Sequence, residues 1–228
     1  MTEIGIVDGS IGSLTVALTV VLALLGAAWG IASDRIATRW PDHDEAEGFM
    51  PGRAVGWRTV VVAAFGAIGL GALPSRFDGP FELVIFGAYV VVLVLLLATD
   101  LDQRLLPDLL TLPMIPIALL FALSGQNPLV GAAIVPAIAA ALIIPAIMYL
   151  PSILFGPGAF GLGDVKLLVT VGLISGAYRA VAGTLVGVIV AGAVILVLLL
   201  TRRVTLKSYI PFGPFLILGA LWAILLRS

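Results

Sequence analysis

Apolar residues fill most of the chain in long runs that short polar segments separate. The runs cover approximately residues 11–32, 59–73, 83–99, 109–124, 129–150, 167–178, 180–200 and 210–226. A helix needs roughly 20 apolar residues to cross the hydrocarbon core of a bilayer, and most of these runs approach that length. The pattern therefore predicts an all-α, polytopic membrane protein with about eight transmembrane helices in a single membrane domain, residues 1–228. A turn signal near Gly176 and Arg179 divides the sixth run from the seventh; without that division, seven helices are expected.

Composition supports a membrane protein and narrows the chemistry. Of the 228 residues, 61% are hydrophobic and 11% are charged, whereas about 25% of residues in soluble domains are charged. The net charge of −1 gives no basic patch for nucleic acid. The chain has no cysteine and one histidine, His43, which excludes disulfides, thiolate metal sites and multi-histidine metal sites. We therefore expect no metal and no cofactor, and chemistry that relies on carboxylates, lysine or hydroxyl groups.

The basic residues orient the chain in the bilayer. With the N-terminus outside, the cytoplasmic side carries Arg35, Arg39, Arg53, Arg58, Arg104, Lys166, Arg202, Arg203 and Lys207. The outer side then carries Arg76, Arg179 and Arg227. Because cytoplasmic loops are rich in lysine and arginine, this orientation is favoured. A secretory signal begins with basic residues, and here the first basic residue is Arg35; we expect the first run to be an anchor and not a cleaved leader.

A long uncharged stretch places two acidic segments on one side of the membrane. Residues 109–163 contain no Asp, Glu, Lys or Arg and are interrupted by the turn GQNP at 125–128. Such a stretch predicts two helices that cross the membrane and return. Asp108, before the stretch, and Asp164, after it, must then face the same side.

The acidic residues fall into two kinds of segment. The polar loop predicted over residues 33–58 holds five of the 13 acids, and these are expected to form a solvated surface. The segment TDLDQRLLPD instead puts Asp100, Asp102 and Asp108 between two apolar runs, and GPGAFGLGDVKLL puts Asp164 at the start of another. Acids at such boundaries are costly unless they find water, partners or a function.

Each of these residues also has a structural interpretation. Asp108 and Asp164 could cap the helices that follow them, and Lys166 could be an interfacial anchor. Asp102 is expected to be solvated beside Arg104. Against this, two acidic segments brought to one face can activate water on an amide, one carboxylate as general base and the other as general acid. The residues alone leave the partner of Asp164 open among the three acids of the first segment.

The glycines before Asp164 have two interpretations. Gly161 and Gly163 leave room for an extended substrate backbone and permit positive φ just before the acid. The alternative is a flexible loop between helices, and a GxGD pattern by itself is weak in a chain with 26 glycines.

Three ordered motifs resemble those of the type IV prepilin peptidases, GxGD-type aspartyl proteases related to archaeal preflagellin peptidases and, more distantly, to presenilins. The first motif is Asp100 with Pro107 and Asp108, and the second is GxGDxK at residues 161–166. The third is PFGPFL at residues 211–216, whose prolines could also simply begin a helix. The resemblance covers roughly residues 83–226, which is the expected peptidase core.

The resemblance implies a site and an activity. It makes Asp100 and Asp164 the catalytic pair, with Gly161, Gly163, Lys166, Pro107 and Asp108 as substrate-binding or supporting residues. The expected activity is cleavage of the leader of prepilin-like precursors at the cytoplasmic face of the cell membrane, without a cofactor. Bifunctional members carry paired cysteines in a cytoplasmic segment after the first span; here that region is the cysteine-free loop 33–58, so N-methylation is not expected.

Two other functions fit the pattern less well. A small transporter could use Asp100 and Asp164 as a proton or cation relay, but both acids lie at a boundary of the apolar runs and no inverted repeat is visible. A non-catalytic membrane assembly factor would use the acids only as helix caps.

Overall fold

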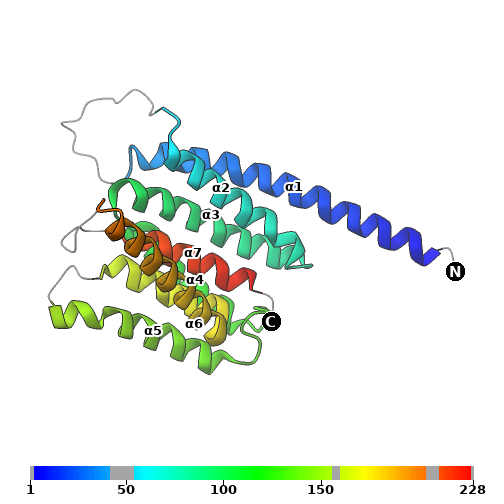
Figure 1. The fold of residues 1–228 in the computed structure, drawn as a ribbon. Helices are drawn as coiled ribbons and strands as arrows, with labels where there is room; N and C mark the ends of the chain where they lie inside the picture. Colours follow the sequence, from blue (N-terminus) through cyan, green and yellow to red (C-terminus); the bar gives the residue numbers. More distant parts are fainter. Residues whose placement is uncertain (1–2, 42–53, 156–159, 204–210, 227–228) are drawn as a thin grey trace. The chain divides into compact units, whose positions relative to one another are not determined.

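The computed structural model describes residues 3–41, 54–155, 160–203 and 211–226, and its regular elements there are all helical. They are α1 (Glu3–Ala37), α2 (Trp57–Ala72), η1 (Leu73–Ser75), α3 (Pro80–Gln103), α4 (Asp108–Leu123), α5 (Ile134–Phe155), α6 (Leu162–Leu200) and α7 (Gly213–Leu225) (Figure 1). The all-α prediction is confirmed. The segment predicted as loop 33–58 is shorter, because α1 continues to Ala37 and α2 begins at Trp57.

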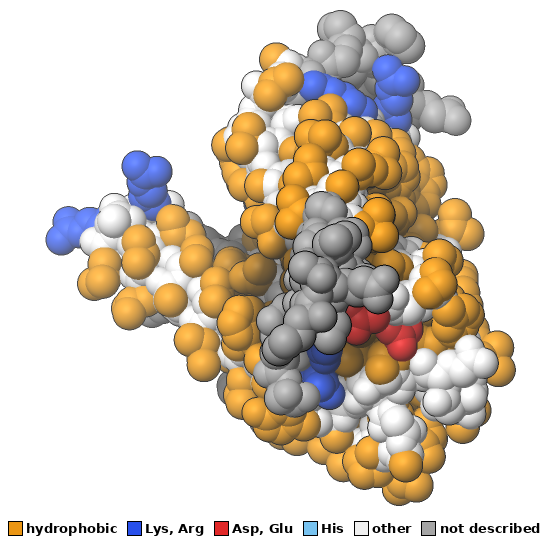
Figure 2. Space-filling view, turned by 90° about the vertical axis from the view of Figure 1, so that its right-hand side faces the viewer, with side chains coloured by type: hydrophobic (Ala, Val, Ile, Leu, Met, Phe, Trp, Pro, Cys, Tyr) orange, Lys and Arg blue, Asp and Glu red, His pale blue; other side chains and the backbone are white. Residues whose placement is uncertain are grey.

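The helices have the length and surface of membrane helices. Among the described residues, α1, α2 with η1, α3, α5 and α6 are each long and apolar enough to cross a bilayer, and α4 and α7 are shorter apolar helices. The face shown in Figure 2 is mostly hydrophobic, with charged side chains gathered in small patches. A water-soluble protein rarely exposes such continuous apolar surface, so the polytopic membrane fold is confirmed.

Helix α6 is interrupted where the sequence predicts a turn. Gly176 has φ 75° and ψ 168° inside this otherwise helical stretch of 39 residues. This region of backbone conformation is essentially restricted to glycine. A Cβ on Gly176 would also lie 2.9 Å from the carbonyl oxygen of Leu129. The break divides α6 into two helical segments, which correspond to the sixth and seventh predicted runs.

The chain forms two compact units, divided between Asp102 and Gln103. In the first unit, α1 and α2 approach closely at Gly26 and Gly66, where a side chain on either glycine would overlap the backbone of the other. Small residues permit such close helix packing in membranes. The indole N–H of Trp29 donates to the carbonyl of Val91 at 2.9 Å, which joins α1 to α3.

The second unit is arranged around α6, which packs against α4, α5 and α7. Its contacts again depend on glycine. A Cβ on Gly172 would lie 2.5 Å from the Cα of Ala141 in α5, and Gly183 meets the backbone of Gly219 in α7. These close contacts hold the two segments of α6, before and after the break, against α5 and α7.

Candidate active site

Asp100 lies in the last turn of α3 and is almost completely buried, with 5% of its surface exposed. The helix ends at Gln103, and Arg104 adopts a left-handed conformation with φ 56°. The chain therefore turns directly after the first two acids of the motif. Leu106 and Pro107, which follow, are buried.

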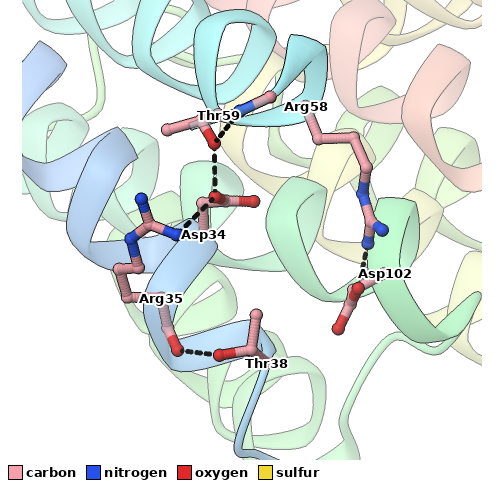
Figure 3. A network of polar contacts seen from close by, with 7 residues as sticks. Asp34, Arg35, Thr38, Arg58, Thr59 and Asp102 are labelled. Carbon is pink, nitrogen blue, oxygen red and sulfur yellow. Dashed lines mark hydrogen bonds and ion pairs between the residues drawn. The ribbon is translucent and has the colours of Figure 1, made fainter. Parts of the chain in front are cut away.

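Asp102 is bound to a cation from another helix. Its carboxylate forms a short ion pair with the guanidinium of Arg58, the second residue of α2 (Figure 3). The prediction that Asp102 is solvated beside Arg104 is therefore wrong. Helix packing in the first unit supplies a partner 44 positions away in the sequence, which no local pattern could identify.

Asp34 is a buried acid that the sequence analysis missed. The prediction of a solvated surface for the acids of loop 33–58 is wrong for Asp34, since only 2% of this residue is exposed. The hydroxyl of Thr59 donates to its Oδ2 at 2.7 Å and itself accepts the N–H of Gly56 at 3.2 Å (Figure 3). Asp34 is buried because α1 continues to Ala37, about one turn past the apolar run that ends at residue 32. Extending the predicted helix by one turn would have placed Asp34 on it. The other acids assigned to that loop lie outside the described residues.

Asp164 is the third residue of α6 and is partly buried. Its carboxylate accepts a hydrogen bond from the backbone of Gly161, the N-cap residue. Asp164 therefore bonds back to the N-cap from inside the first turn of its helix, which begins at Leu162, five residues before the predicted apolar run, so Asp164 is not itself the N-cap residue. Gly161 has φ −74° and ψ 143°, and the positive-φ glycines among the described residues are at other positions. The expectation of positive φ before this acid is wrong.

Gly163 packs against the first motif instead of lining an open loop. A Cβ at this position would lie 2.8 Å from the Cβ of Leu106 and 3.2 Å from its carbonyl oxygen. Glycine is thus needed at position 163 for a close approach between two segments of the second unit. The contact brings the residues just before Pro107 against the first turn of α6.

Asp108 and Lys166 form an ion pair at the same place. The Nζ of Lys166 lies 2.5 Å from Oδ1 of Asp108, whose side chain is 62% exposed. Asp108 is the first residue of α4, and its side chain makes no capping hydrogen bond there. The capping interpretation is therefore wrong for Asp108. This contact brings the two ends of the uncharged stretch 109–163 together, as the predicted helical hairpin requires.

The third motif lies at the start of α7. Pro214 is in the first turn of that helix, as the structural interpretation predicted. The ring of Phe212 meets the ring of Phe160 edge-on, with centroids 5.9 Å apart. Phe160 is also held to α5, because its N–H donates to Ser152 Oγ at 2.7 Å and its carbonyl accepts from the same hydroxyl at 3.1 Å. The residue just before Gly161 is thus anchored from two helices.

The chemistry available at these motifs is that of carboxylates. Within the described part of the chain, no three His, Cys, Asp or Glu residues are grouped so that they could hold a metal ion. Asp100 belongs to the first unit and Asp164 to the second, and their catalytic pairing stays a prediction based on the family resemblance.

Comparison with known proteins identifies a family and several relatives of this chain. Residues 87–200, half of the chain, match the type IV leader peptidase family. A prepilin leader peptidase/N-methyltransferase of Burkholderia pseudomallei is 33% identical over 160 residues, which are 70% of this chain and 52% of that protein. Proteins of the same name are 38% identical over 136 residues in Aeromonas salmonicida (59% of this chain, 46% of that protein) and 30% identical over 173 residues in Pectobacterium carotovorum (74% and 59%). The chain thus spans about half the length of these relatives. No solved structure matches it significantly.

Proposed function

We propose that this chain, which belongs to the type IV leader peptidase family, is a membrane aspartyl endopeptidase that removes the leader from prepilin-like precursors. One observation carries the proposal. The motif segment around Pro107 and Asp108 is held against the GxGD turn by the Gly163–Leu106 contact and the Lys166–Asp108 pair. Both acidic motifs lie within the residues that match the family.

The proposed reaction is hydrolysis by Asp100 and Asp164. One carboxylate, ionised, takes a proton from a water molecule as its oxygen attacks the scissile carbonyl carbon. The other carboxyl, protonated, donates its proton to the carbonyl oxygen. The tetrahedral intermediate then collapses with cleavage of the C–N bond. The proton held by the first aspartate goes to the leaving amine, and a hydroxyl group of the intermediate returns a proton to the second aspartate. No metal ion or organic cofactor takes part.

The surroundings of the other acids support the choice of Asp100. The carboxylate of Asp102 forms an ion pair with Arg58, and the carboxylate of Asp108 forms one with Lys166. A general acid or base must reach the water and the scissile carbonyl directly, and a carboxylate bound to a cation from a neighbouring helix is poorly placed for this. Asp100 lies in the same turn of α3 as Asp102, and the family resemblance pairs it with Asp164.

The substrate and the side of cleavage follow from the family and from the charge distribution. A prepilin-like precursor carries a short basic, polar leader ahead of an apolar helix. We propose that the apolar helix lies in the bilayer and that the scissile bond is presented at the cytoplasmic face of the cell membrane. The bias of lysine and arginine toward that side supports this orientation.

The proposal excludes N-methylation by this chain. The curated relatives are named as peptidases and N-methyltransferases. In this chain the segment between α1 and α2 contains no cysteine, nor does the chain as a whole. We therefore propose that cleavage is the only one of the two activities retained.

Purified protein in detergent, incubated with a prepilin-like peptide, tests the function. We expect one cleavage, between the leader and the apolar segment, and no added methyl mass when a methyl donor is present. Asp34→Asn is the matched control for Asp100→Asn, because both replace a buried carboxylate of the first unit with its isosteric amide. Asp34→Asn should retain cleavage and Asp100→Asn should lose it. Full cleavage by both Asp100→Asn and Asp164→Asn would exclude the proposed mechanism.

A further inference from the structure

Each aspartate of the proposed catalytic pair is followed, two positions later, by a residue held in an ion pair. Asp102 follows Asp100 and binds Arg58 of α2 (Figure 3). In the second unit, Lys166 follows Asp164 and binds Asp108. Both partners come from the start of another helix, since Arg58 is the second residue of α2 and Asp108 the first of α4.

Helix geometry gives this spacing a mechanical meaning. At 3.6 residues per turn, side chains two positions apart point about 200° away from each other around the helix axis. They therefore do not face the same partner. The ion pair on Asp102 therefore restrains one face of its helical turn, and Asp100 lies on the opposite face. The ion pair on Lys166 has the same relation to Asp164.

The first pair is placed against both helix dipoles. Arg58 is a cation at the N-terminus of α2, and Asp102 is an anion at the C-terminus of α3. A helix dipole favours anions at its N-terminus and cations at its C-terminus. The charge of Arg58 does not stabilise α2, and the charge of Asp102 does not stabilise α3. The favourable interaction of these two side chains is therefore their contact with each other, between the two helices.

The first pair also differs from an ordinary surface ion pair in its burial. The side chains of Arg58 and Asp102 are 19% and 8% exposed. In the second pair only Lys166 is shielded, with 23% exposed, whereas Asp108 is 62% exposed. Groups shielded in this way have few other conformations, and a shielded pair restrains helix rotation more strongly than a solvated one.

We propose that these two ion pairs set the rotation of the helical turns that carry Asp100 and Asp164, which makes Arg58 and Asp108 positioning residues for peptide cleavage. This inference rests on the proposed function. In this proposal the pairs act through the helical turns and not by contact with the substrate or the reacting atoms. Their loss changes the direction of a catalytic carboxyl, and a small misplacement of a catalytic group lowers the rate of the chemical step.

Charge reversal tests the first pair. Arg58→Glu puts two carboxylates side by side, and we expect kcat to fall by about tenfold or more while KM stays within about twofold. Arg58→Lys keeps the charge and should retain most of the activity. The reversed pair, Arg58→Glu with Asp102→Arg, restores the contact and should recover kcat to within about threefold of wild type. The matched control is Arg203→Glu, the same charge change at an exposed arginine after α6.

The second pair is tested in the same way. Asp108→Lys should lower kcat, and combining it with Lys166→Glu should restore it. Melting temperature in detergent is measured for every variant, and rates are expressed per folded molecule. If Arg58→Glu does not fold, Arg58→Ala, which removes both the charge and the hydrogen-bond donors without adding repulsion, takes its place.

Three results would overturn the inference. If the double variants with reversed charges have kcat values as low as the single variants, the contact between the charges does not determine the cleavage rate. A rise in KM alone would assign Arg58 or Lys166 to substrate binding. A lower melting temperature with an unchanged kcat per folded molecule would leave the pairs a purely structural role. In all three, wild type cleaves the peptide; a wild-type protein that cleaves nothing would instead contradict the proposed function.

Discussion

The side-chain amide of Asn127 donates a hydrogen bond to the carbonyl oxygen of Ile174 at 2.9 Å. Ile174 lies two residues before the break at Gly176, where the backbone of α6 departs from helical φ and ψ. Asn127 is 1% exposed, and its Oδ1 accepts the N–H of Leu129 at 2.9 Å. One side chain thus satisfies a carbonyl next to the helix break and an N–H of the turn between α4 and α5. Backbone groups within a membrane protein require such internal partners.

Asn127→Ala should destabilise the second unit. It leaves two buried backbone groups without their partner, at a cost of about 1–3 kcal/mol for each group. The measurement is thermal unfolding in detergent. Gln126→Ala is the matched control, because the neighbouring side chain is exposed. Equal melting temperatures for the two variants would contradict the role of Asn127.

Two glycines at the start of α6, Gly163 and the N-cap residue Gly161, should respond differently to alanine. Gly163→Ala forces a methyl group against Leu106, so we expect melting temperature and cleavage to fall together. Gly161→Ala places Cβ 3.2 Å from Oδ2 of Asp164, and its backbone conformation suits alanine. There we expect cleavage to fall, with a loss of stability of at most about 1 kcal/mol.

Gly192→Ala is the control for both glycine variants. No heavy atom lies within 4 Å of a Cβ at this position of α6, and alanine favours a helix over glycine by roughly 0.5–1 kcal/mol. Its cleavage should match wild type. Should Gly163→Ala keep both its melting temperature and its cleavage rate, the close packing on Leu106 would have no consequence for function.

Asp100→Asn and Asp164→Asn should each abolish cleavage while the protein stays folded in the membrane. Residues that act as one unit are strongly non-additive, so the double variant should be no slower than either single one. Asp102→Asn should retain substantial activity, because the amide oxygen can still accept a hydrogen bond from Arg58. The assay is cleavage rate per folded molecule. If Asp102 is indispensable and Asp100 dispensable, the catalytic residue of the first motif has been assigned wrongly.

Cysteine labelling tests the orientation, since the chain has no native cysteine. Leu105→Cys lies in an exposed position between α3 and α4, and Gln126→Cys lies in the turn after α4. We expect a membrane-impermeant reagent to label Leu105→Cys from the cytoplasmic side only and Gln126→Cys from the outside only. Labelling of both from one side would mean that α4 does not cross the bilayer. Labelling with the two sides exchanged would put the proposed site outside the cell.

Much of the architecture follows from local patterns of the sequence. The apolar runs predict the helices because lipid accepts few other structures, and the turn signal near Gly176 predicts the break in α6. The uncharged stretch 109–163 brings Asp108 and the start of α6 together by the same constraint, because a helical hairpin must return to the side on which it entered.

Only the tertiary structure decided which charged groups meet. Asp102 binds Arg58, which is distant in sequence, and Asp34 is buried beside Thr59. Gly163 is needed for its contact with Leu106 and not for positive φ. Each of these contacts joins helices that are distant in sequence, at a depth and rotation set by how their small residues pack. Hydrophobic periodicity shows which residues enter the membrane, but the partner of a boundary charge depends on which helix end lies beside it.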